Sequence, residues 1–162
     1  PERVHEIVTR RIDDSLKVTD PVTGKTFQVY RATDESGTPV GVAFVISGNG
    51  FWAPITGLLA LSPDRTRILR AVFTDNKETP GLGGRITEEA FQEKQFEGLD
   101  ATKPADDKPY LYVASQRPEA GPRARRTVEA ITGATQTSRA VVKFVNVDLA
   151  AFQRAMDAGE KP

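Results

Sequence analysis

Two short segments of the chain combine glycine, hydroxyl and acidic residues in a pattern that suits a binding site. The first, Glu78 to Gly84, reads Glu-Thr-Pro-Gly-Leu-Gly-Gly, and the second, Thr132 to Ser138, reads Thr-Gly-Ala-Thr-Gln-Thr-Ser. The second segment leads into an amphipathic stretch, so its backbone N–H groups are expected at the start of a helix, where phosphate binds readily. The plain alternative is an ordinary helix cap.

The Glu78 to Gly84 segment matches neither of the common nucleotide-binding loops. Ile86 stands where the third glycine of a dinucleotide fingerprint would be, and no Gly-Lys-Ser/Thr follows the glycines. A loop with few side chains lets its backbone lie against a flat ligand, with Glu78 and Thr79 as polar contacts at the rim. The alternative is a plain surface turn.

The composition excludes several classes of protein. Lys plus Arg and Asp plus Glu both total 22, so no net field draws the chain to nucleic acid, and we expect no nucleic-acid partner. Cysteine is absent and His5 is the single histidine, so we expect no metal and no thiolate chemistry. Any redox role would therefore need an organic cofactor. The longest apolar run, Val42 to Ile46, is far shorter than the roughly 20 residues that cross a bilayer.

Hydrophobic periodicity predicts a helix followed by strands in the first half of the chain. Apolar residues recur at helical spacing within Glu2 to Leu16, which predicts an opening helix. Segments rich in strand-forming residues and separated by turn residues then predict two strand pairs, Thr26 to Ala32 with Val40 to Ser47, and Gly57 to Leu61 with Arg67 to Thr74. The middle third is thus expected to be an antiparallel meander.

The second half is predicted to hold two helices and one strand. A helix is expected from Thr87 to Phe96, and a strand from Tyr110 to Ser115 within a loop-rich region. A long amphipathic helix should begin near Thr137 or Ser138 and bury one apolar stripe, made of Val141, Val145, Leu149, Phe152 and Met156. We expect one α+β domain over residues 1–162, a twisted antiparallel sheet with packed helices, in which residues 1–25 form a helical opening segment and 26–157 the core.

Taken together, these motifs resemble a known family of flavin proteins. The string Gly48-Asn49-Gly50-Phe51-Trp52 leads into Gly57 to Leu61, and the Glu78 and Thr132 segments follow in the same order. This arrangement is similar to the FMN-binding domain of the NqrC component of the sodium-pumping NADH:quinone reductase and of the RnfG component of the Rnf ferredoxin:NAD oxidoreductase. The resemblance covers roughly Thr26 to Phe152.

The resemblance implies a covalent cofactor and names its site. In that family the last threonine of the Ser/Thr-Gly-Ala-Thr motif bears FMN through a phosphoester bond, which a flavin transferase forms from FAD, and Thr135 is the matching residue. The family usually has Asp six residues earlier, where this chain has Glu129. Thr137 and Ser138 are the candidates for hydrogen bonds to the phosphate. The residues expected to bind the cofactor are Thr135, Thr132, Gly133, Ala134, Thr137, Ser138, Glu78, Thr79, Pro80, Gly81, Leu82, Gly83 and Trp52.

Trp52 and a basic stretch each have two interpretations. By resemblance the flavin ring lies between the Thr79 to Gly83 loop and the segment Gly50 to Trp52, since a broad apolar ring needs apolar cover. Trp52 fits a core or edge position beneath the sheet equally well. The basic stretch comprises Arg117, Arg123, Arg125 and Arg126. It could dock an acidic partner or screen the phosphate, but a solvated loop is the commoner role of such a run.

The resemblance implies an electron relay rather than an independent enzyme. The corresponding domains stand on the extracytoplasmic, periplasmic side of the membrane, held by one N-terminal helix, and exchange electrons with membrane redox subunits of an Rnf- or Nqr-like complex. No such helix stands in this sequence, so we expect a shortened form or a member freed from the membrane. The alternatives are a flavin-free binding or assembly module of the same fold, and a hydrolase or transferase with a Ser or Thr nucleophile, for which no activating base is placed.

Overall fold

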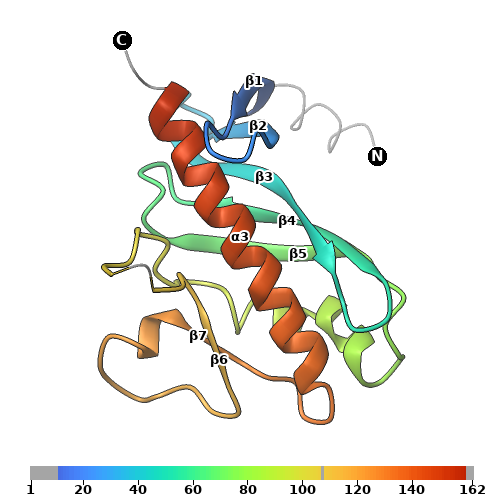
Figure 1. Cartoon of the computed structure of the whole chain (residues 1–162). Coiled ribbons are helices and arrows are strands. Elements are labelled where there is room, and N and C mark those ends of the chain that lie inside the picture. Colours follow the sequence, from blue (N-terminus) through green and yellow to red (C-terminus); the bar gives the residue numbers. More distant parts are fainter. Residues whose placement is uncertain (1–10, 107, 160–162) are drawn as a thin grey trace.

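The chain folds as an antiparallel sheet with one long helix laid across a single face (Figure 1). The computed structural model describes residues 11–106 and 108–159. The five strands of the sheet lie side by side in chain order and are β1 (Ile12–Thr19), β2 (Thr26–Thr33), β3 (Pro39–Asn49), β4 (Pro54–Leu61) and β5 (Ile68–Asp75). The predicted α+β architecture and antiparallel meander are confirmed.

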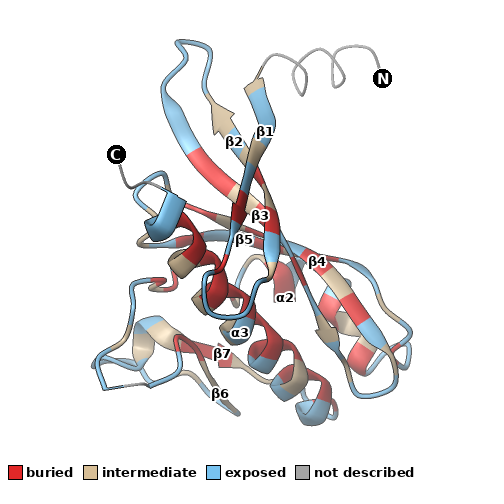
Figure 2. Cartoon of the chain, turned by 45° about the horizontal axis from the view of Figure 1, so that its top comes forward, coloured by how far each residue is buried: buried red, intermediate tan, exposed pale blue. Residues whose placement is uncertain are grey.

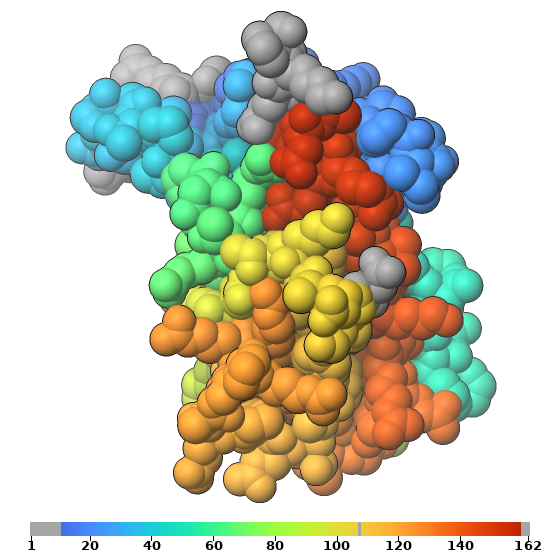
Figure 3. All heavy atoms as spheres, turned by 60° about the vertical axis from the view of Figure 1, so that its left-hand side comes forward, coloured from blue at the N-terminus to red at the C-terminus, as the bar shows by residue number. Residues whose placement is uncertain are grey.

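The second half wraps around the sheet and ends in the long helix. Its elements are the 3-10 turn η1 (Gly83–Thr87), the short helix α2 (Glu89–Gln92), β6 (Tyr112–Ala114), the 3-10 turn η2 (Ala124–Arg126), β7 (Thr127–Glu129) and α3 (Thr135–Gly159). Strands β6 and β7 pair in parallel as a separate small sheet. Figure 3 shows this part of the chain, in yellow and orange, spread over one side of the molecule next to α3 in red.

The core forms where α3 meets the inner face of the sheet. The five predicted stripe positions of α3 are all buried, as periodicity indicated. Phe152 stacks on Phe44 of β3 with ring centroids 3.8 Å apart, and Phe27 of β2 contacts both rings edge-on. Figure 2 shows the buried residues, in red, along α3 and the strands beneath it. The helix begins at Thr135, two or three residues before the predicted start near Thr137 or Ser138.

The predicted opening helix is wrong over its last residues. Ile12–Thr19 is strand β1, which pairs antiparallel with β2. Leu16 and Val18 alternate with exposed residues and pack toward the core, so the period of two, supported by hydrogen bonds from β2, outweighs the helical spacing. The rest of that predicted helix, through residue 10, lies outside the described residues.

The helix predicted from Thr87 to Phe96 is much shorter than expected. Only Glu89–Gln92 is α-helical, and looser turns follow as far as Gly98. The Arg117 guanidinium donates to the carbonyl oxygen of Gln95 at 2.8 Å. In a longer helix, this carbonyl would accept a backbone N–H from the next turn instead. The strand predicted at Tyr110 to Ser115 is β6, and its parallel partner β7 was not predicted.

No helix in the described part of the chain combines the length and the apolar character that crossing a membrane requires. Helix α3 is long enough, but only one side of it is apolar, and that side is turned to the sheet.

The turn between β1 and β2 is tied to α3 by an ion pair. Asp20 is fully buried and accepts two hydrogen bonds from the Arg154 guanidinium, at 2.9 and 2.7 Å. The hydroxyl of Thr23 donates to the same carboxylate at 2.6 Å. Arg154 and these local donors hold the pKa of Asp20 well below its usual range.

Asp20→Asn is expected to lower the free energy of unfolding at neutral pH by about 1–3 kcal/mol, because Arg154 loses a charged acceptor. A carboxyl with a depressed native pKa stabilises the fold fully above its unfolded pKa of about 3.9, and this contribution is lost as the pH falls further. Urea unfolding should therefore show a smaller difference in the free energy of unfolding between wild type and variant at about pH 3. A difference that grows on acidification would contradict this. Asp13→Asn, which removes an exposed pair with Arg31, is the control and should change little.

A glycine sets how closely α3 approaches β3. A Cβ built on Gly48 would lie 2.3 Å from the Cβ of Phe144, so no larger residue fits without moving the helix. Asp148, one turn further along α3, is buried and accepts the backbone N–H of Ser47 at 2.9 Å and an ion pair from Lys25. These contacts fix the helix over the end of β3.

Gly48→Ala should destabilise the protein by about 1–3 kcal/mol, because the added methyl group overpacks the contact with Phe144. Gly159→Ala is the matched control: its Cβ would meet Val18 at an ordinary 3.5 Å, so stability should hold or rise slightly. Thermal unfolding of both variants tests the difference. Equal melting temperatures for Gly48→Ala and wild type would show that α3 is free to shift.

Candidate functional site

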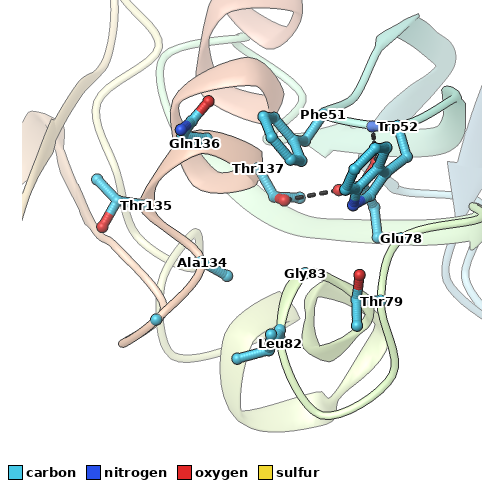
Figure 4. Close-up of a pocket in the computed structure, with 11 residues that line it drawn as sticks. Phe51, Trp52, Glu78, Thr79, Leu82, Gly83, Ala134, Thr135, Gln136 and Thr137 are labelled. Carbon is cyan, nitrogen blue, oxygen red and sulfur yellow. Dashed lines mark hydrogen bonds between the residues drawn. The ribbon is translucent and has the colours of Figure 1, made fainter.

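A pocket of about 410 Å³ opens where three separate segments of the chain meet. They are the connection between β3 and β4, the loop after β5, and the first turn of α3 (Figure 4). The volume falls within the roughly 300–1,000 Å³ typical of small-ligand sites. The lining residues are Phe51, Trp52, Glu78, Thr79, Leu82, Gly83, Gly133, Ala134, Thr135, Gln136 and Thr137.

The carboxylate of Glu78 joins the three segments. One oxygen accepts the backbone N–H of Trp52 at 2.9 Å, and the other accepts the hydroxyl of Thr137 at 2.6 Å, as the dashed lines in Figure 4 show. The side chain of Asn76 in turn accepts the N–H of Glu78 at 3.1 Å. Glu78 is only 5% exposed, so it is an organising group within the wall rather than a contact at the rim.

Two glycines leave the space that this carboxylate occupies. A Cβ on Gly50 would lie 2.6 Å from one oxygen of Glu78, and a Cβ on Gly83 would lie 2.8 Å from the other and 2.6 Å from the hydroxyl of Thr137. These two glycines therefore let the backbone lie close to the carboxylate of Glu78. Of the three glycines in the loop, only Gly81, with φ of 74°, lies in the left-handed region.

The start of α3 presents an exposed hydroxyl and free backbone donors. Thr135 and Gln136 are exposed, whereas Ala134 beside them is buried. We find no acceptor among the described residues for the N–H groups of Thr135, Gln136 and Thr137, nor a partner for the Thr135 hydroxyl. Such orphan donors at the positive end of a long helix form a favourable place for an anion.

The other two predicted hydroxyl donors are already engaged. Thr137 donates to Glu78, and the buried Ser138 donates to the carbonyl of Ala134 at 3.1 Å while accepting the N–H of Ile131 at 3.0 Å. Ser138 thus stabilises the start of α3 from its buried side. Neither hydroxyl is free for a ligand without giving up a bond within the protein.

The structure brings most of the predicted site residues together. Trp52, Glu78, Thr79, Leu82, Gly83, Gly133, Ala134, Thr135 and Thr137 line the pocket. Outside its lining lie Pro80, Gly81, Thr132 and Ser138, of which Thr132 borders a neighbouring hollow beside Glu129. Phe51 and Gln136 line the pocket without having been singled out. Both residues lie within the motifs on which the resemblance rests, so the resemblance could have identified them.

An apolar rim borders the pocket. Trp52 is 67% exposed and Phe51 46%, and their rings meet edge-on with centroids 4.8 Å apart. Leu82 is exposed as well and lines the pocket from the η1 side. The interpretation of Trp52 as a core residue beneath the sheet is wrong. Large exposed apolar side chains around a hollow are typical of a binding surface.

The basic stretch is neither a simple solvated loop nor a free patch. Arg117 donates to the carbonyls of Thr127 and Gln95, and Arg126 pairs with Asp100 at 2.7 Å. Arg123 lies over the ring of Tyr112, 4.6 Å from its centroid. These side chains hold the loop-rich region around β6 and β7, and only Arg125 is exposed with no contact of this kind in the described part.

Within residues 11–106 and 108–159, no group of three or more His, Cys, Asp and Glu side chains lies close enough to hold a metal ion. The chemistry available to the pocket is that of a carboxylate, hydroxyls, backbone donors and aromatic faces. Such a set binds and orients a ligand that supplies its own reactivity.

The chain resembles the NqrC proteins of sodium-translocating NADH-quinone reductases in sequence. The Pasteurella multocida protein is 32% identical over 114 residues, covering 70% of this chain and 42% of the relative. The protein from Neisseria meningitidis serogroup B is 31% identical over 131 residues, covering 78% and 49%. The chain thus spans less than half the length of these relatives.

Solved structures of such proteins share the fold. The crystal structure of the Parabacteroides distasonis protein superposes with a TM-score of 0.77 over 94% of this chain and 82% of that one, and Shewanella oneidensis NqrC with 0.72 over 92% and 69%, both at 22% identity. A profile of the FMN-binding domain family matches residues 50–150, which contain the whole pocket. The chain belongs to the family of FMN-binding domains.

Proposed function

We propose that this domain carries FMN covalently on Thr135 and relays electrons within a membrane-associated redox complex. The single observation that carries the proposal is the place of Thr135: an exposed hydroxyl at the first turn of α3, on the lining of the pocket and beside free backbone donors. A hydroxyl in this position is reachable by a modifying enzyme. A cofactor attached there has the pocket directly beside it.

A flavin transferase attaches the cofactor by transferring the FMN phosphoryl group from FAD to Thr135. The Thr135 oxygen forms the new bond to the FMN phosphorus of FAD, the pyrophosphate bond of FAD breaks, and AMP leaves while the hydroxyl proton is lost. The product is a phosphodiester with one negative charge. The N–H groups of Gln136 and Thr137 then stabilise that charge at the helix start, because their donors are otherwise unpaired among the described residues.

The pocket fits a flat, largely apolar ring with polar edges. Trp52 and Leu82 offer apolar cover from opposite segments, and Gly83 lets the loop beside Leu82 lie close to Glu78. FMN supplies the electron chemistry when it is bound. The side chains of the pocket hold the ring, exclude water from its faces and present Glu78 beside it.

The relatives support a membrane-associated setting for the domain. Both sequence relatives described above are subunits of sodium-translocating NADH-quinone reductases. By resemblance the domain works on the periplasmic side of the cytoplasmic membrane, with membrane redox subunits of an Nqr- or Rnf-like complex as its partners. The aromatic rim at the pocket mouth leaves the flavin near the surface, where electrons pass between proteins.

Co-expression with a flavin transferase followed by intact-mass measurement tests the linkage. Wild type should gain the mass of FMN less water, and Thr135→Ala should lose that adduct completely, because the attacking oxygen is gone. Thr74→Ala, which removes another exposed threonine hydroxyl on β5, is the matched control and should keep the adduct.

An unmodified wild-type mass after co-expression with an active transferase would favour a flavin-free binding module of the same fold. An adduct that survives in Thr135→Ala would move the linkage to another side chain. The transferase should be shown to be active on a second substrate protein in the same cells, so that an unmodified mass is decisive.

A further inference from the structure

Three acidic side chains of the described part are buried, and two of them have cations. Asp20 pairs with Arg154, and Asp148 pairs with Lys25. Glu78 has no lysine, arginine or histidine within ion-pair distance among residues 11–106 and 108–159. In this described part, its charge is met only by the Trp52 N–H and the Thr137 hydroxyl.

This arrangement is costly for stability alone. A buried charge loses its hydration, and two neutral donors recover less of that loss than a cation does. A threonine hydroxyl and a backbone N–H could be joined by a neutral acceptor just as well. The chain nevertheless places an acid here and keeps two neighbouring positions as glycine, Gly50 and Gly83, so that the carboxylate fits.

The location of the charge suggests its use. Glu78 lines the same pocket as Thr135 and Trp52, and its two hydrogen bonds prevent the carboxylate from turning away toward solvent. A fixed charge in a water-poor wall acts more strongly on a neighbouring group than an exposed charge does.

We propose that the carboxylate of Glu78 holds the reduction potential of the flavin low. The inference rests on the proposed function, since it concerns the cofactor attached at Thr135. Each electron that the flavin receives from its donor adds one negative charge, unless a proton from solvent accompanies it. The nearby carboxylate raises the energy of the reduced form relative to the oxidised form, so reduction becomes harder and the reduced flavin becomes a stronger donor.

The test is the midpoint potential of flavinylated Glu78→Gln. Glutamine keeps the shape and can still accept from the Trp52 N–H, while the charge is lost. At a fixed applied potential, the ratio of reduced to oxidised flavin should rise at least tenfold, which equals about 30 mV for a two-electron couple. Glu88→Gln is the matched control: it removes an exposed carboxylate that pairs with Arg85, and solvent screens it, so the ratio should change little.

A second variant separates charge from shape. Glu78→Asp keeps the charge and shortens the side chain by one methylene, so its flavin should retain a low potential even where the bond to Trp52 is lost. Because Trp52 is the single tryptophan, the emission of the unmodified protein reports on the surroundings of its indole ring at the pocket rim. Unchanged emission in Glu78→Gln shows that the wall around Trp52 is not rearranged, so that a shift in potential comes from the charge.

The outcomes distinguish this inference from the proposed function. A wild-type adduct with an unshifted potential in folded Glu78→Gln overturns the role of Glu78 and leaves the covalent flavin intact. Absence of the wild-type adduct overturns both. If Glu78→Gln does not fold, Glu78→Asp decides: a potential close to wild type supports the role of the charge, and a tenfold rise in the ratio of reduced to oxidised flavin overturns it.

Discussion

The close approach of α3 to the end of β3 is the constraint on which the rest of the structure depends. Gly48 lets Phe144 lie against the strand, and Asp148 then takes the N–H of Ser47, so the helix is held at one place along the sheet. The first turn of α3 thereby comes beside the connection from β3 to β4. A helix shifted by one turn, about 5.4 Å, would separate Thr137 from Glu78 and open the pocket wall.

Sequence periodicity predicted the elements whose residues are buried on one side only. The apolar, β-rich run in β3 predicted a strand, in which Phe44 and Ile46 are buried and Val45 is exposed, and the apolar stripe of α3 predicted a long helix. The Glu78 and Thr132 motifs indicated the pocket because together, and in this order, they resemble those of the FMN-binding family. Each of these signals is local in the chain, which is why a single sequence reveals it.

The features that sequence reasoning missed depend on contacts between distant segments. Strand β1 exists because β2 pairs with it, and α2 stops early because Arg117, some twenty residues on, binds the carbonyls that follow it. The same holds within the site. Thr137 was predicted as a phosphate donor by its place at the helix start, but it is bonded to Glu78, 59 residues away, which no local pattern records.

The wall of the pocket and the core of the domain use buried acids for different ends. Asp20 and Asp148 face cations and fasten α3 to the β1–β2 turn and to β3, so each lies in a nearly neutral setting. Glu78 fastens three segments as well, but through neutral donors, and its negative charge is left for whatever fills the pocket. In the proposed function, one side chain therefore both orders the pocket wall and tunes the bound cofactor.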